Sequence, residues 1–486
     1  MAQLTVIAGG VAKTVAFEGT PLVADLLRAH GYQVPTPCGG KGVCGKCAVQ
    51  AEGSLSPPAK DGRCLACSTR LTGDAVITLA AAETLRNIAL SGDLPLFDAS
   101  PVPGRYGLAV DIGTTTLAAA LIDLRQAKTV AFAARRNPQR EIADNVIGRI
   151  EASLEGAGSQ LQASVRGEID ALKKEACQQA GMDEAQVDAT VITGNTTMLY
   201  LWDGRNPLTL SRAPFEADWL AGGWAADGKT YLPRCIGAFL GADIVCAVLA
   251  SRMTTHDETV LLIDIGTNGE IALWHQGRLY CCATAAGPAF EGGGIRDGVG
   301  SVAGAVDTVR VENGKLAYTT IADAPPIGIC GSGLIDAAAS LLALDMLDET
   351  GSLDEDEASI APGVALTGQD IRKLQLAKGA VAAGIRTLCR HLDIALEDIG
   401  SFYIAGGFGA HLNMENAAQI GLIPRALRHK AVSIGNAALA GAMMMLMRQE
   451  FMDEAMQIAD HAEVITLSGS AEFSEAFVDS MMFEEM

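Results

Sequence analysis

The sequence predicts a small α+β domain at the N-terminus, followed by a large α/β domain that consists of two similar halves. Two groups of residues carry this prediction. Five of the twelve cysteines lie between Cys38 and Cys67, in a segment that otherwise indicates short strands and one helix. The tetrapeptide Asp-Ile-Gly-Thr occurs twice, at residues 111–114 and 264–267, and each copy follows an apolar run. A chain of 486 residues is also longer than one ordinary domain.

The composition excludes several functional classes. The formal net charge is −21, from 57 acidic and 36 basic side chains, so we expect no unaided binding to nucleic acid or to an anionic membrane. No run approaches 18 uninterrupted apolar residues, and the first residues lack the charged region and cleavage site of a signal peptide. We therefore expect a cytoplasmic protein, in which disulfides are rare and clustered cysteines indicate a metal.

The first 80 residues carry the signals of a hairpin, a helix and a closing strand. Apolar and polar residues alternate over 4–7, a glycine pair supplies a turn, and 14–17 has the pattern of a return strand. A short helix with one apolar face follows, and residues 75–79 form the last strand. We expect a β-grasp domain over 1–80 and, because of its proline and glycine content, a linker over 81–104.

The remaining residues are expected to form the two halves of one α/β unit, 105–250 and 251–486. The strand that precedes each Asp-Ile-Gly-Thr copy is followed by a second apolar run, at 117–122 and at 270–273. A strand–turn–strand unit that recurs after 153 positions indicates two similarly folded halves that face each other.

The cysteine cluster is open to two interpretations. Cys44, Cys47, Cys64 and Cys67 have the spacing of a structural zinc site, C-x2-C-x16-C-x2-C. The alternative is a [2Fe–2S] cluster held by Cys38, Cys44, Cys47 and one later cysteine. Four glycines interleave these cysteines and favour iron–sulfur, because they let a loop wrap tightly round a cluster and direct amide groups at its sulfurs. A zinc site would also leave Cys38 without a role.

Each Asp-Ile-Gly-Thr copy has the features of a phosphate-binding turn. An apolar strand delivers Asp111 or Asp264 to its end, where the carboxylate can hold Mg²⁺ or one of its waters. The glycine lets the backbone turn close to phosphate, and the polar residues that follow offer N–H and side-chain donors. Further glycine-rich turns stand at 194–197, 331–333 and 406–409. The last one follows an expected strand, and its bare glycines would let the chain approach a flat adenosine.

These segments, in this order, resemble the superfamily of sugar kinases, heat-shock chaperones and actin. The resemblance implies an ATPase fold of two RNase H-like halves that uses ATP and Mg²⁺, with catalytic roles for Asp111 and Asp264. It also implies which residues contact the nucleotide. The first phosphate loop matches at Gly113, Thr114, Thr115 and Thr116, the second at Gly266, Thr267, Asn268 and Gly269, a further turn at Gly331, Ser332 and Gly333, and the adenosine segment at Gly406, Gly407 and Phe408.

The cysteine loop resembles the ferredoxin family. Residues 37–47 match its cluster loop, and 65–67 match its last ligand. The resemblance implies that Cys38 and Cys44 hold one iron of a [2Fe–2S] cluster and that Cys47 and Cys67 hold the other. Cys64 would then be a spare thiol, and an exchange of roles between Cys64 and Cys67 is left open.

A ferredoxin domain joined to this ATPase fold resembles the reductive activators of corrinoid proteins. The resemblance spans nearly the whole chain and includes 137–139, 286–292 and 329–336. It implies ATP-dependent reduction of inactive Co(II) corrinoid protein to Co(I), the nucleophile of methyl transfer. The implied partners are a corrinoid protein of a methyltransferase system and an upstream electron donor, and the sequence leaves a homodimer open. Because the linker is short, we expect the middle domain of longer members to be absent.

Three other functions are kept as alternatives. A small-molecule kinase of the same superfamily would transfer phosphate to an acceptor and would give the ferredoxin domain only an accessory role. A plain electron carrier would use the large domain as a docking scaffold, and its activity would survive the loss of Asp264. A zinc-stabilised ATPase would be colourless and would contain zinc instead of iron.

Overall fold

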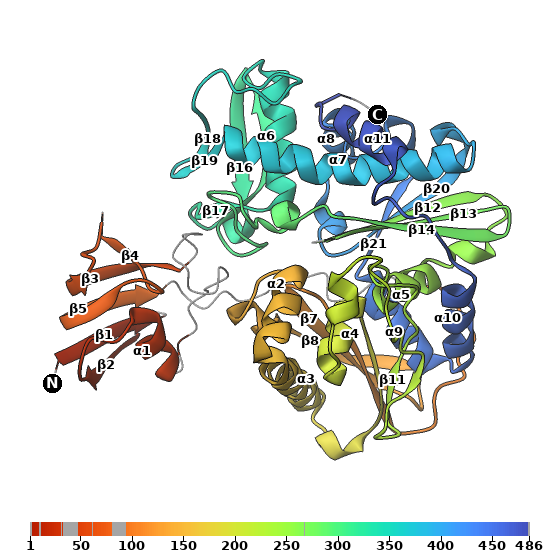
Figure 1. The fold of residues 1–486 in the computed structure, drawn as a ribbon, viewed down its shortest axis with the longest axis horizontal. Helices are drawn as coiled ribbons and strands as arrows, with labels where there is room; N and C mark the ends of the chain where they lie inside the picture. The colour runs from red at the N-terminus through yellow and green to blue at the C-terminus, as the bar shows by residue number, and fades with distance from the viewer. Residues whose placement is uncertain are drawn as a thin grey trace. The chain divides into compact units, whose positions relative to one another are not determined.

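The structure of the chain is a computed structural model that describes residues 2–8, 11–30, 32, 47–60, 62–79, 94–266 and 268–484. The chain divides into two compact units, which we describe separately (Figure 1). The small unit comprises Met1–Thr84 and Pro138–Ser164, and the large unit comprises Leu85–Asn137 and Val165–Met486. Three of the predicted site residues, Cys38, Cys44 and Thr267, lie outside the described residues.

In the described residues of Met1–Thr84, the small unit forms a mixed sheet and one helix. The strand order is β2-β1-β5-β3-β4; β1 pairs antiparallel with β2 and parallel with β5. Alternate residues of the first strand, Leu4 and Val6, are fully buried together with Val23 and Leu27 of the helix. This arrangement confirms the predicted β-grasp elements. Their bounds are β1 (Ala2–Ala8), β2 (Val11–Phe17), α1 (Val23–Ala29), β3 (Ala48–Ser56), β4 (Arg63–Leu65) and β5 (Arg70–Leu79).

Residues 138–164 form a short helical segment around a buried arginine. The Arg149 side chain is fully buried, and its Nε donates to Ala143 O at 3.0 Å while its Nη1 donates to Gln139 Oε1 at 3.2 Å. These acceptors satisfy the guanidinium away from water and fix the turn between two helices. The elements are η1 (Pro138–Glu141), α2 (Val146–Ala152), the π-helical turn η2 (Ser153–Ala157) and the start of α3 (Gly158–Ala180).

The large unit contains two six-stranded sheets with the same core topology. In each, three consecutive strands form an antiparallel meander, and a later strand pairs parallel to the first of the three. This repeat confirms the prediction of two similar halves. The first sheet, in spatial order, is β10 (Gly223–Trp224), β11 (Thr230–Leu232), β9 (Val187–Gly194), β6 (Tyr106–Ile112), β7 (Thr116–Asp123) and β8 (Lys128–Arg136). The second is β21 (Ala431–Gly435), β20 (Ile399–Ala405), β12 (Thr259–Ile265), β13 (Gly269–His275), β14 (Arg278–Thr284) and β22 (Glu463–Val464).

Two apolar helices join the halves. Helices α5 (Ala242–Ser251) and α9 (Ala437–Met447) pack against each other and contact strands of the two sheets. Gly441 permits their close approach, because a Cβ on it would clash with the backbone of Cys246. The helices and the inner faces of both sheets form one hydrophobic cluster, so the two halves share a core. Also in this unit are α4 (Thr196–Asp203) and α10 (Glu450–His461).

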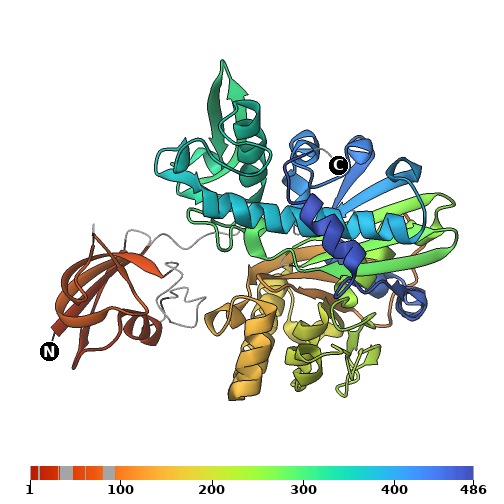
Figure 2. The ribbon, with the colours of Figure 1, turned by 45° about the horizontal axis from the view of Figure 1, so that its top comes forward.

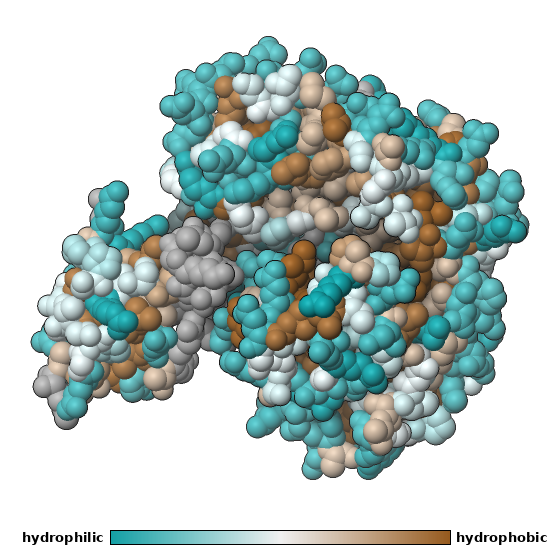
Figure 3. All heavy atoms as spheres, in the orientation of Figure 1, coloured by the Kyte–Doolittle hydropathy of each residue, from teal (hydrophilic) through white to brown (hydrophobic). Residues whose placement is uncertain are grey.

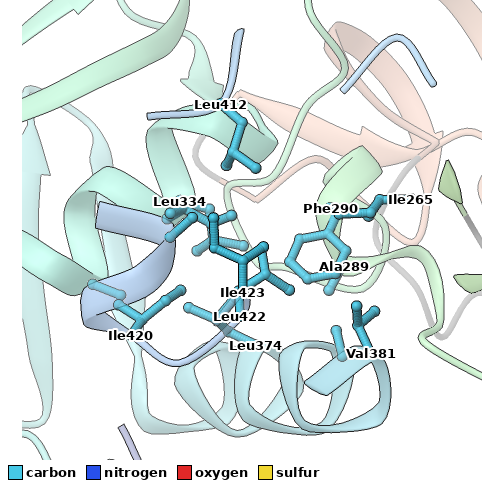
Figure 4. Close-up of a cluster of buried hydrophobic side chains, with 14 of the residues drawn as sticks. Ile265, Ala289, Phe290, Leu334, Leu374, Val381, Leu412, Ile420, Leu422 and Ile423 are labelled. Carbon is cyan, nitrogen blue, oxygen red and sulfur yellow. The ribbon is translucent and has the colours of Figure 1, made fainter. Parts of the chain in front are cut away.

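The outer face of the second sheet is covered by α7 (Gly368–His391), which is crossed by α11 (Ala471–Asp479) (Figures 1 and 2). Under these helices lies the cluster drawn in Figure 4, which includes Phe290 and Val381. The other elements here are β15 (Ala305–Glu312), β16 (Lys315–Thr320), β17 (Gly328–Ile329), α6 (Gly331–Ala343), β18 (Glu357–Ala361), β19 (Val364–Thr367) and α8 (Met414–Gln419). Short 3₁₀ turns in the unit are η3 (Glu184–Gln186), η4 (Leu208–Ser211), η5 (Met253–Thr255), η6 (Pro288–Glu291), η7 (Ile321–Asp323), η8 (Leu396–Asp398), η9 (Gly409–His411) and η10 (Arg425–Leu427).

The described part of the predicted linker belongs to the large unit. Ser100 N and Val102 N donate to Met447 O and Leu446 O at 3.1 and 3.0 Å, and Phe97 contacts the Phe451 ring edge-on. These contacts attach residues 94–104 to the end of α9 and the start of α10. The boundaries 1–80, 81–104, 105–250 and 251–486 stay a prediction.

Candidate functional site

The predicted first phosphate loop follows β6, a central strand of the first sheet. Buried residues on both sides of the strand fix its position, and Asp111 lies at its carboxyl end, opposite Thr193 of β9 and Ala118 of β7. The loop between β6 and β7 is anchored by Asn137, whose Nδ2 donates to Gly113 O at 2.9 Å. This position agrees with the prediction that an apolar strand delivers the carboxylate to the end of the strand. Thr114 is buried, and Thr115 and Thr116 are half-buried.

Two asparagines connect the first loop to helix N-termini. Asn436 caps α9 by accepting from Leu439 N at 2.8 Å, and its Nδ2 donates to Asp111 Oδ2 at 3.0 Å. Asn195 caps α4 in the same way, and its Nδ2 donates to Thr114 Oγ1 at 3.3 Å. In each asparagine, the side-chain carbonyl accepts a hydrogen bond from a helix N–H that has no partner within the helix. The side-chain amide nitrogen of the same residue orients a loop residue. Through Asn436, the second half of the unit contacts the first loop directly.

The predicted second phosphate loop follows β12, a central strand of the second sheet. Asp264 lies at the end of this strand, opposite Glu270 of β13 and Ala405 of β20. Gly266 N donates to Asn268 O at 3.0 Å, which closes the turn, and Gly269 begins β13. Gly406, with φ of +90°, packs so closely that a Cβ on it would lie 2.7 Å from Asp264 Oδ1. Only glycine fits there, both because of its backbone conformation and because of the adjacent carboxylate.

Four carboxylates influence one another at these strand ends. Burial raises the pKa of Asp111 to about 7; a hydrogen bond from Asn436 lowers it, and the charge of Asp243 raises it. Burial, then the charges of Asp243 and Asp111, raises the pKa of Asp264 to about 7. Burial also raises the pKa of Asp243 to about 6, and it raises that of Glu270, helped by Asp243 and Asp264. The site therefore concentrates negative charge that a bound cation would relieve.

The residues of the large unit fit Mg²⁺ with a nucleotide phosphate. Mg²⁺ prefers oxygen ligands and is usually bound through one or two carboxylates together with substrate phosphates and water. Asp111 and Asp264 supply such carboxylates, and a bound cation would favour their ionised form and so lower the pKa that burial raises. In the described parts of the chain, no group of three His, Cys, Asp or Glu side chains is arranged to hold a metal ion alone. In the space-filling view, the large unit is hollowed between its two sheet-bearing halves (Figure 3).

Sequence reasoning missed Asp243 and Glu270. Asp243 lies in the first turn of α5 after Gly241, and a Cβ on that glycine would lie 2.7 Å from Asp243 Oδ1. Its signal in the sequence was weak, a glycine and an acid at the start of an apolar segment. Glu270 directly follows the second loop, so its place in the sequence was visible, but its burial depended on the pairing of β12 with β13.

The predicted adenosine segment is packed against a second glycine-rich turn. Phe408 stacks on Phe290, with ring centroids 5.1 Å apart and an interplanar angle of 27°. A Cβ on Gly331 would clash with Phe290 O and would lie 2.8 Å from a ring carbon of Phe408. Ser332 is buried, and its Oγ donates to Asp307 O at 2.9 Å. The structure thus brings the segments 331–333 and 406–408 together, and Ser332 is used to anchor the start of α6.

The cysteines that the structure describes in the small unit are buried in its core. Cys47 Sγ and Cys67 Sγ lie 3.1 Å apart, so the two thiols that were predicted to share one iron face each other. Cys64 lies on β4 opposite Val49; burial raises the pKa of its thiol, partly offset by a hydrogen bond with Thr69. Adjacent buried thiols are the donor chemistry that a [2Fe–2S] cluster requires. The choice between Cys64 and Cys67 as the fourth ligand stays a prediction.

Comparison with known proteins finds the same combination of domains. Family models match three segments: a 2Fe-2S iron-sulfur cluster binding domain at 7–72, the RACo middle region at 106–256, and the C-terminal domain of RACo, the ASKHA domain, at 258–486. The corrinoid activation enzyme RamQ of Eubacterium limosum is 31% identical over 428 residues, which cover 78% of this chain and 70% of RamQ. A [Co(II) methylated amine-specific corrinoid protein] reductase of Methanosarcina barkeri is 25% identical over 425 residues, 78% of this chain and 77% of that protein.

A solved structure agrees over the whole length. The reductive activator for corrinoid, iron–sulfur protein matches with a TM-score of 0.71 and 27% sequence identity, over 99% of this chain and 98% of that one. The match at 106–256 shows that the expected absence of a middle domain was wrong. Linker length was a poor guide, because the matched middle region contains the strands of the first sheet of the large unit. Over the described residues, none of the helices combines the length and apolarity needed to cross a bilayer.

Proposed function

Because this chain belongs to the RACo family of reductive activators for corrinoid proteins, we propose that it reduces inactive Co(II) corrinoid protein to Co(I), and that ATP drives this reduction. The observation that carries the proposal is the presence of two different sites in one chain. The small unit holds a buried pair of thiols, and the large unit holds two loops with carboxylates whose pKa is raised. The first suits one-electron transfer, and the second suits Mg-ATP.

ATP would supply the free energy that the electron transfer requires. Reduction of Co(II) by a ferredoxin-type donor is uphill, and a gap of about 100 mV for one electron corresponds to about 2.3 kcal/mol. A ligand that shifts a two-state equilibrium almost completely must contribute roughly 5.5 kcal/mol of differential binding. Differential nucleotide binding of this size between the halves of the large unit would offset the gap. We infer that closure of the halves changes the contact with the corrinoid protein so that the cobalt becomes reducible.

We assign the ATP site to the two loops. Asp111 and Asp264 would hold Mg²⁺ directly or through its waters, as their position at the ends of equivalent strands supports. The phosphate donors would be Gly113, Thr114, Thr115 and Thr116 in the first loop and Gly266, Thr267, Asn268 and Gly269 in the second. The turn at 331–333 and the segment 406–408 would lie against the adenosine.

We assign the [2Fe–2S] cluster to Cys38, Cys44, Cys47 and Cys67. When bound, the cluster supplies single electrons at a low potential. Cys47 and Cys67 would hold one iron, which their 3.1 Å separation supports. Cys64 would remain a thiol, because its pKa is raised by burial and its side chain is engaged with Thr69.

The expected partners follow from this chemistry. The named relatives act on corrinoid proteins, and we propose a corrinoid protein of a methyltransferase system as the substrate of this chain. An upstream electron donor would reload the cluster after each turnover. We further propose a cytoplasmic location, and a homodimer stays open to measurement.

The direct test is anaerobic reduction of a Co(II) corrinoid protein, followed by its visible absorption, with and without Mg-ATP. We expect Co(I) to form rapidly only with ATP, and we expect an Asp264→Ala variant to lose this dependence together with the activity. Equal rates without ATP would exclude the coupling. Phosphate transfer to a small acceptor, without any effect of the corrinoid protein, would support the kinase alternative instead.

A second test addresses the metal. The purified chain is expected to contain two irons and to show the visible absorption of a [2Fe–2S] cluster, which Cys67→Ser abolishes and Cys64→Ser retains. The two variants are matched, because both replace a buried thiol by a hydroxyl. A colourless protein with one zinc would remove the redox function, and the reverse result for the two variants would make Cys64 the ligand.

A further inference from the structure

The turn η6 contacts three of the nucleotide-binding segments, although no role has been assigned to it. It spans Pro288–Glu291 and lies within the segment 286–292 that contributed to the family resemblance. Ala289 and Phe290 are buried in the cluster of Figure 4. Glu291, the last residue of the turn, is half-buried.

The Glu291 carboxylate lies beside both phosphate loops. Thr115 Oγ1 of the first loop donates a hydrogen bond to Glu291 Oε2. A Cβ placed on Gly266 of the second loop would lie 3.8 Å from Glu291 Oε1. The two loops come from different halves of the large unit, so this carboxylate is positioned at the place where the halves meet. That is also where, on the proposed function, the terminal phosphate of ATP would lie.

The position of Glu291 is fixed by tight packing around the turn. Gly292 N and Gly293 N donate back to Ala289 O and Pro288 O at 3.0 and 2.8 Å. A Cβ on Gly292 would lie 2.6 Å from Val299 N, so the chain that leaves the turn has no free space. On the other side, Phe290 stacks on Phe408 of the predicted adenosine segment. The carboxylate is thus held on a rigid support.

A carboxylate at this place is unsuited to binding phosphate, because like charges repel. It is suited to accepting a hydrogen bond, as its contact with Thr115 demonstrates. A bound phosphate would compete for the Thr115 hydroxyl, because that residue belongs to the loop that supplies phosphate donors. A carboxylate has several lone pairs, so it can accept a hydrogen bond from a water molecule next to the phosphate while it keeps other contacts.

We propose that Glu291 orients the water that attacks the γ-phosphate of ATP and takes up its proton. This inference rests on the proposed use of ATP. The water oxygen forms a bond to the γ-phosphorus, while the bond from that phosphorus to the β,γ-bridging oxygen breaks and its electron pair leaves with ADP. The proton of the water passes to the Glu291 carboxylate and from there to solvent. A positioned base of this kind typically contributes 10²–10⁴-fold in rate.

The test uses the full chain and separates binding from hydrolysis. Glu291→Gln keeps the shape of the side chain and an acceptor for Thr115, but it cannot take up a proton. We expect Mg²⁺ with a non-hydrolysable ATP analogue to bind within about threefold of wild type by calorimetry, and single-turnover hydrolysis of ATP to fall by on the order of 10²-fold. Glu312→Gln is the matched control, because Glu312 is an exposed acid on β15 that is paired with Arg310, and we expect it to change neither quantity.

A second variant guards against a merely structural effect. In Glu291→Ala, added formate is expected to restore at least fivefold of the lost hydrolysis rate, which a packing role would not allow. Equal losses of analogue binding and hydrolysis in Glu291→Gln, wild-type hydrolysis in that variant, or no formate rescue would each overturn the proposal. Failure of the wild-type chain to bind the analogue would overturn the proposed function as well, so the two failures are distinguishable.

Discussion

The two Asp-Ile-Gly-Thr loops have the same sequence and the same place on equivalent strands, yet their aspartates have different neighbours. Asp111 accepts a hydrogen bond from Asn436, an amide of the opposite half. Asp264 faces the acid Glu270 across the sheet and is packed against by the backbone of Gly406. Burial raises the pKa of both to about 7. A repeated motif therefore sets where a carboxylate lies, and its neighbours set what it can do.

The difference indicates that the two aspartates have different roles. A neutral amide that bridges from the second half makes Asp111 sensitive to the relative position of the halves. The charges of Asp243 and Asp111 act on Asp264, so a cation at Asp264 relieves more repulsion. We expect Asp264 to contribute more to metal binding, and Asp111 to contribute more to coupling between the halves.

The strongest test replaces each aspartate by its neutral isostere. We expect Asp264→Asn to slow single-turnover ATP hydrolysis by about 10³-fold and Asp111→Asn by about 10²-fold, the range for losing one preorganised electrostatic group. The visible spectrum of the small unit serves as the internal control and is expected to stay unchanged in both. A larger loss in Asp111→Asn would reverse the assignment of the two roles.

A smaller effect is expected from the glycines that lie against the loops. In Gly406→Ala, the new Cβ would lie 2.7 Å from Asp264 Oδ1, so the carboxylate must move, and a 1 Å displacement at an active site can cost on the order of 10²-fold in rate. Gly194, with φ of +154°, is the matched position beside the first loop, where a Cβ would lie 2.8 Å from the backbone oxygen of Ile112.

A comparison of the alanine variants of Gly406 and Gly194 separates an effect on the hydrolysis rate from an effect on the stability of the fold. Each variant places a side chain in a backbone conformation that disfavours it, at a cost of roughly 1–3 kcal/mol in the free energy of unfolding. We expect both variants to lower the urea concentration at the unfolding midpoint. Only in Gly406→Ala do we expect the rate of ATP hydrolysis to fall, by about 30-fold or more, because only there is the Asp264 carboxylate displaced. Similar losses of hydrolysis in both variants would mean that the strain, and not the position of Asp264, controls the rate.

The sequence predicted what is local in these sites. Both aspartates, the glycines beside them and the buried thiols lie in short motifs whose hydrophobic and turn patterns can be recognised from neighbouring residues. Asp243, Asn436 and Glu291 were not predicted as site residues, because each reaches its loop only through tertiary packing. Asn436 is 325 positions away from Asp111 in the chain, and its signal in the sequence, a Gly-Asn pair before an apolar helix, is shared with Asn195.

For the fold too, the local features were predicted from the sequence and the long-range pairings were not. The strand–turn–strand repeat revealed two halves, and alternating apolar residues revealed the strands of the small unit. The sheet of β15, β16 and β17, the hairpin of β18 and β19, and the grouping of Pro138–Ser164 with the N-terminal residues were not predicted. These features depend on which segments pair over long sequence separations, and no periodicity within one segment reports that choice.

The two asparagines that cap α9 and α4 contact different loop residues, and their replacement is expected to have a smaller effect than the changes above. Serine retains the helix cap but removes the amide donor, so Asn436→Ser and Asn195→Ser isolate the contacts with Asp111 and Thr114. A hydrogen bond to a charged group contributes about 1.5–3 kcal/mol, so we expect Asn436→Ser to weaken analogue binding by about tenfold in calorimetry, since tenfold corresponds to about 1.4 kcal/mol. Asn195 donates to a neutral hydroxyl and not to a charged group. We therefore expect Asn195→Ser to weaken analogue binding by less than threefold, on the order of the 0.5 kcal/mol of a weak neutral hydrogen bond. Equal effects would show that Asn436 acts only as a cap.

The smallest expected effect is that of pH, and it compares the two aspartates directly. A carboxyl with pKa of about 7 is half protonated at pH 7, and a cation binds only the ionised form. Affinity scales with the ionised fraction, so from pH 7 to 8 we expect analogue binding with Mg²⁺ to tighten by about twofold for each carboxyl that must ionise. Without ligand the sign is opposite, because a folded pKa above the unfolded value of 3.8 stabilises the fold at low pH, and that contribution is lost as pH rises through 7.

The variants decide which aspartate carries this dependence, and their ratio to wild type removes the titration of the nucleotide itself. If both aspartates must ionise, Asp111→Asn and Asp264→Asn each halve the slope of log affinity against pH. Because the cation is expected to reside mainly at Asp264, we predict that Asp264→Asn flattens the slope more, while Asp111→Asn retains most of it. An unchanged slope in both variants would show that neither carboxyl loses a proton on binding, and that the two loops differ only in structure.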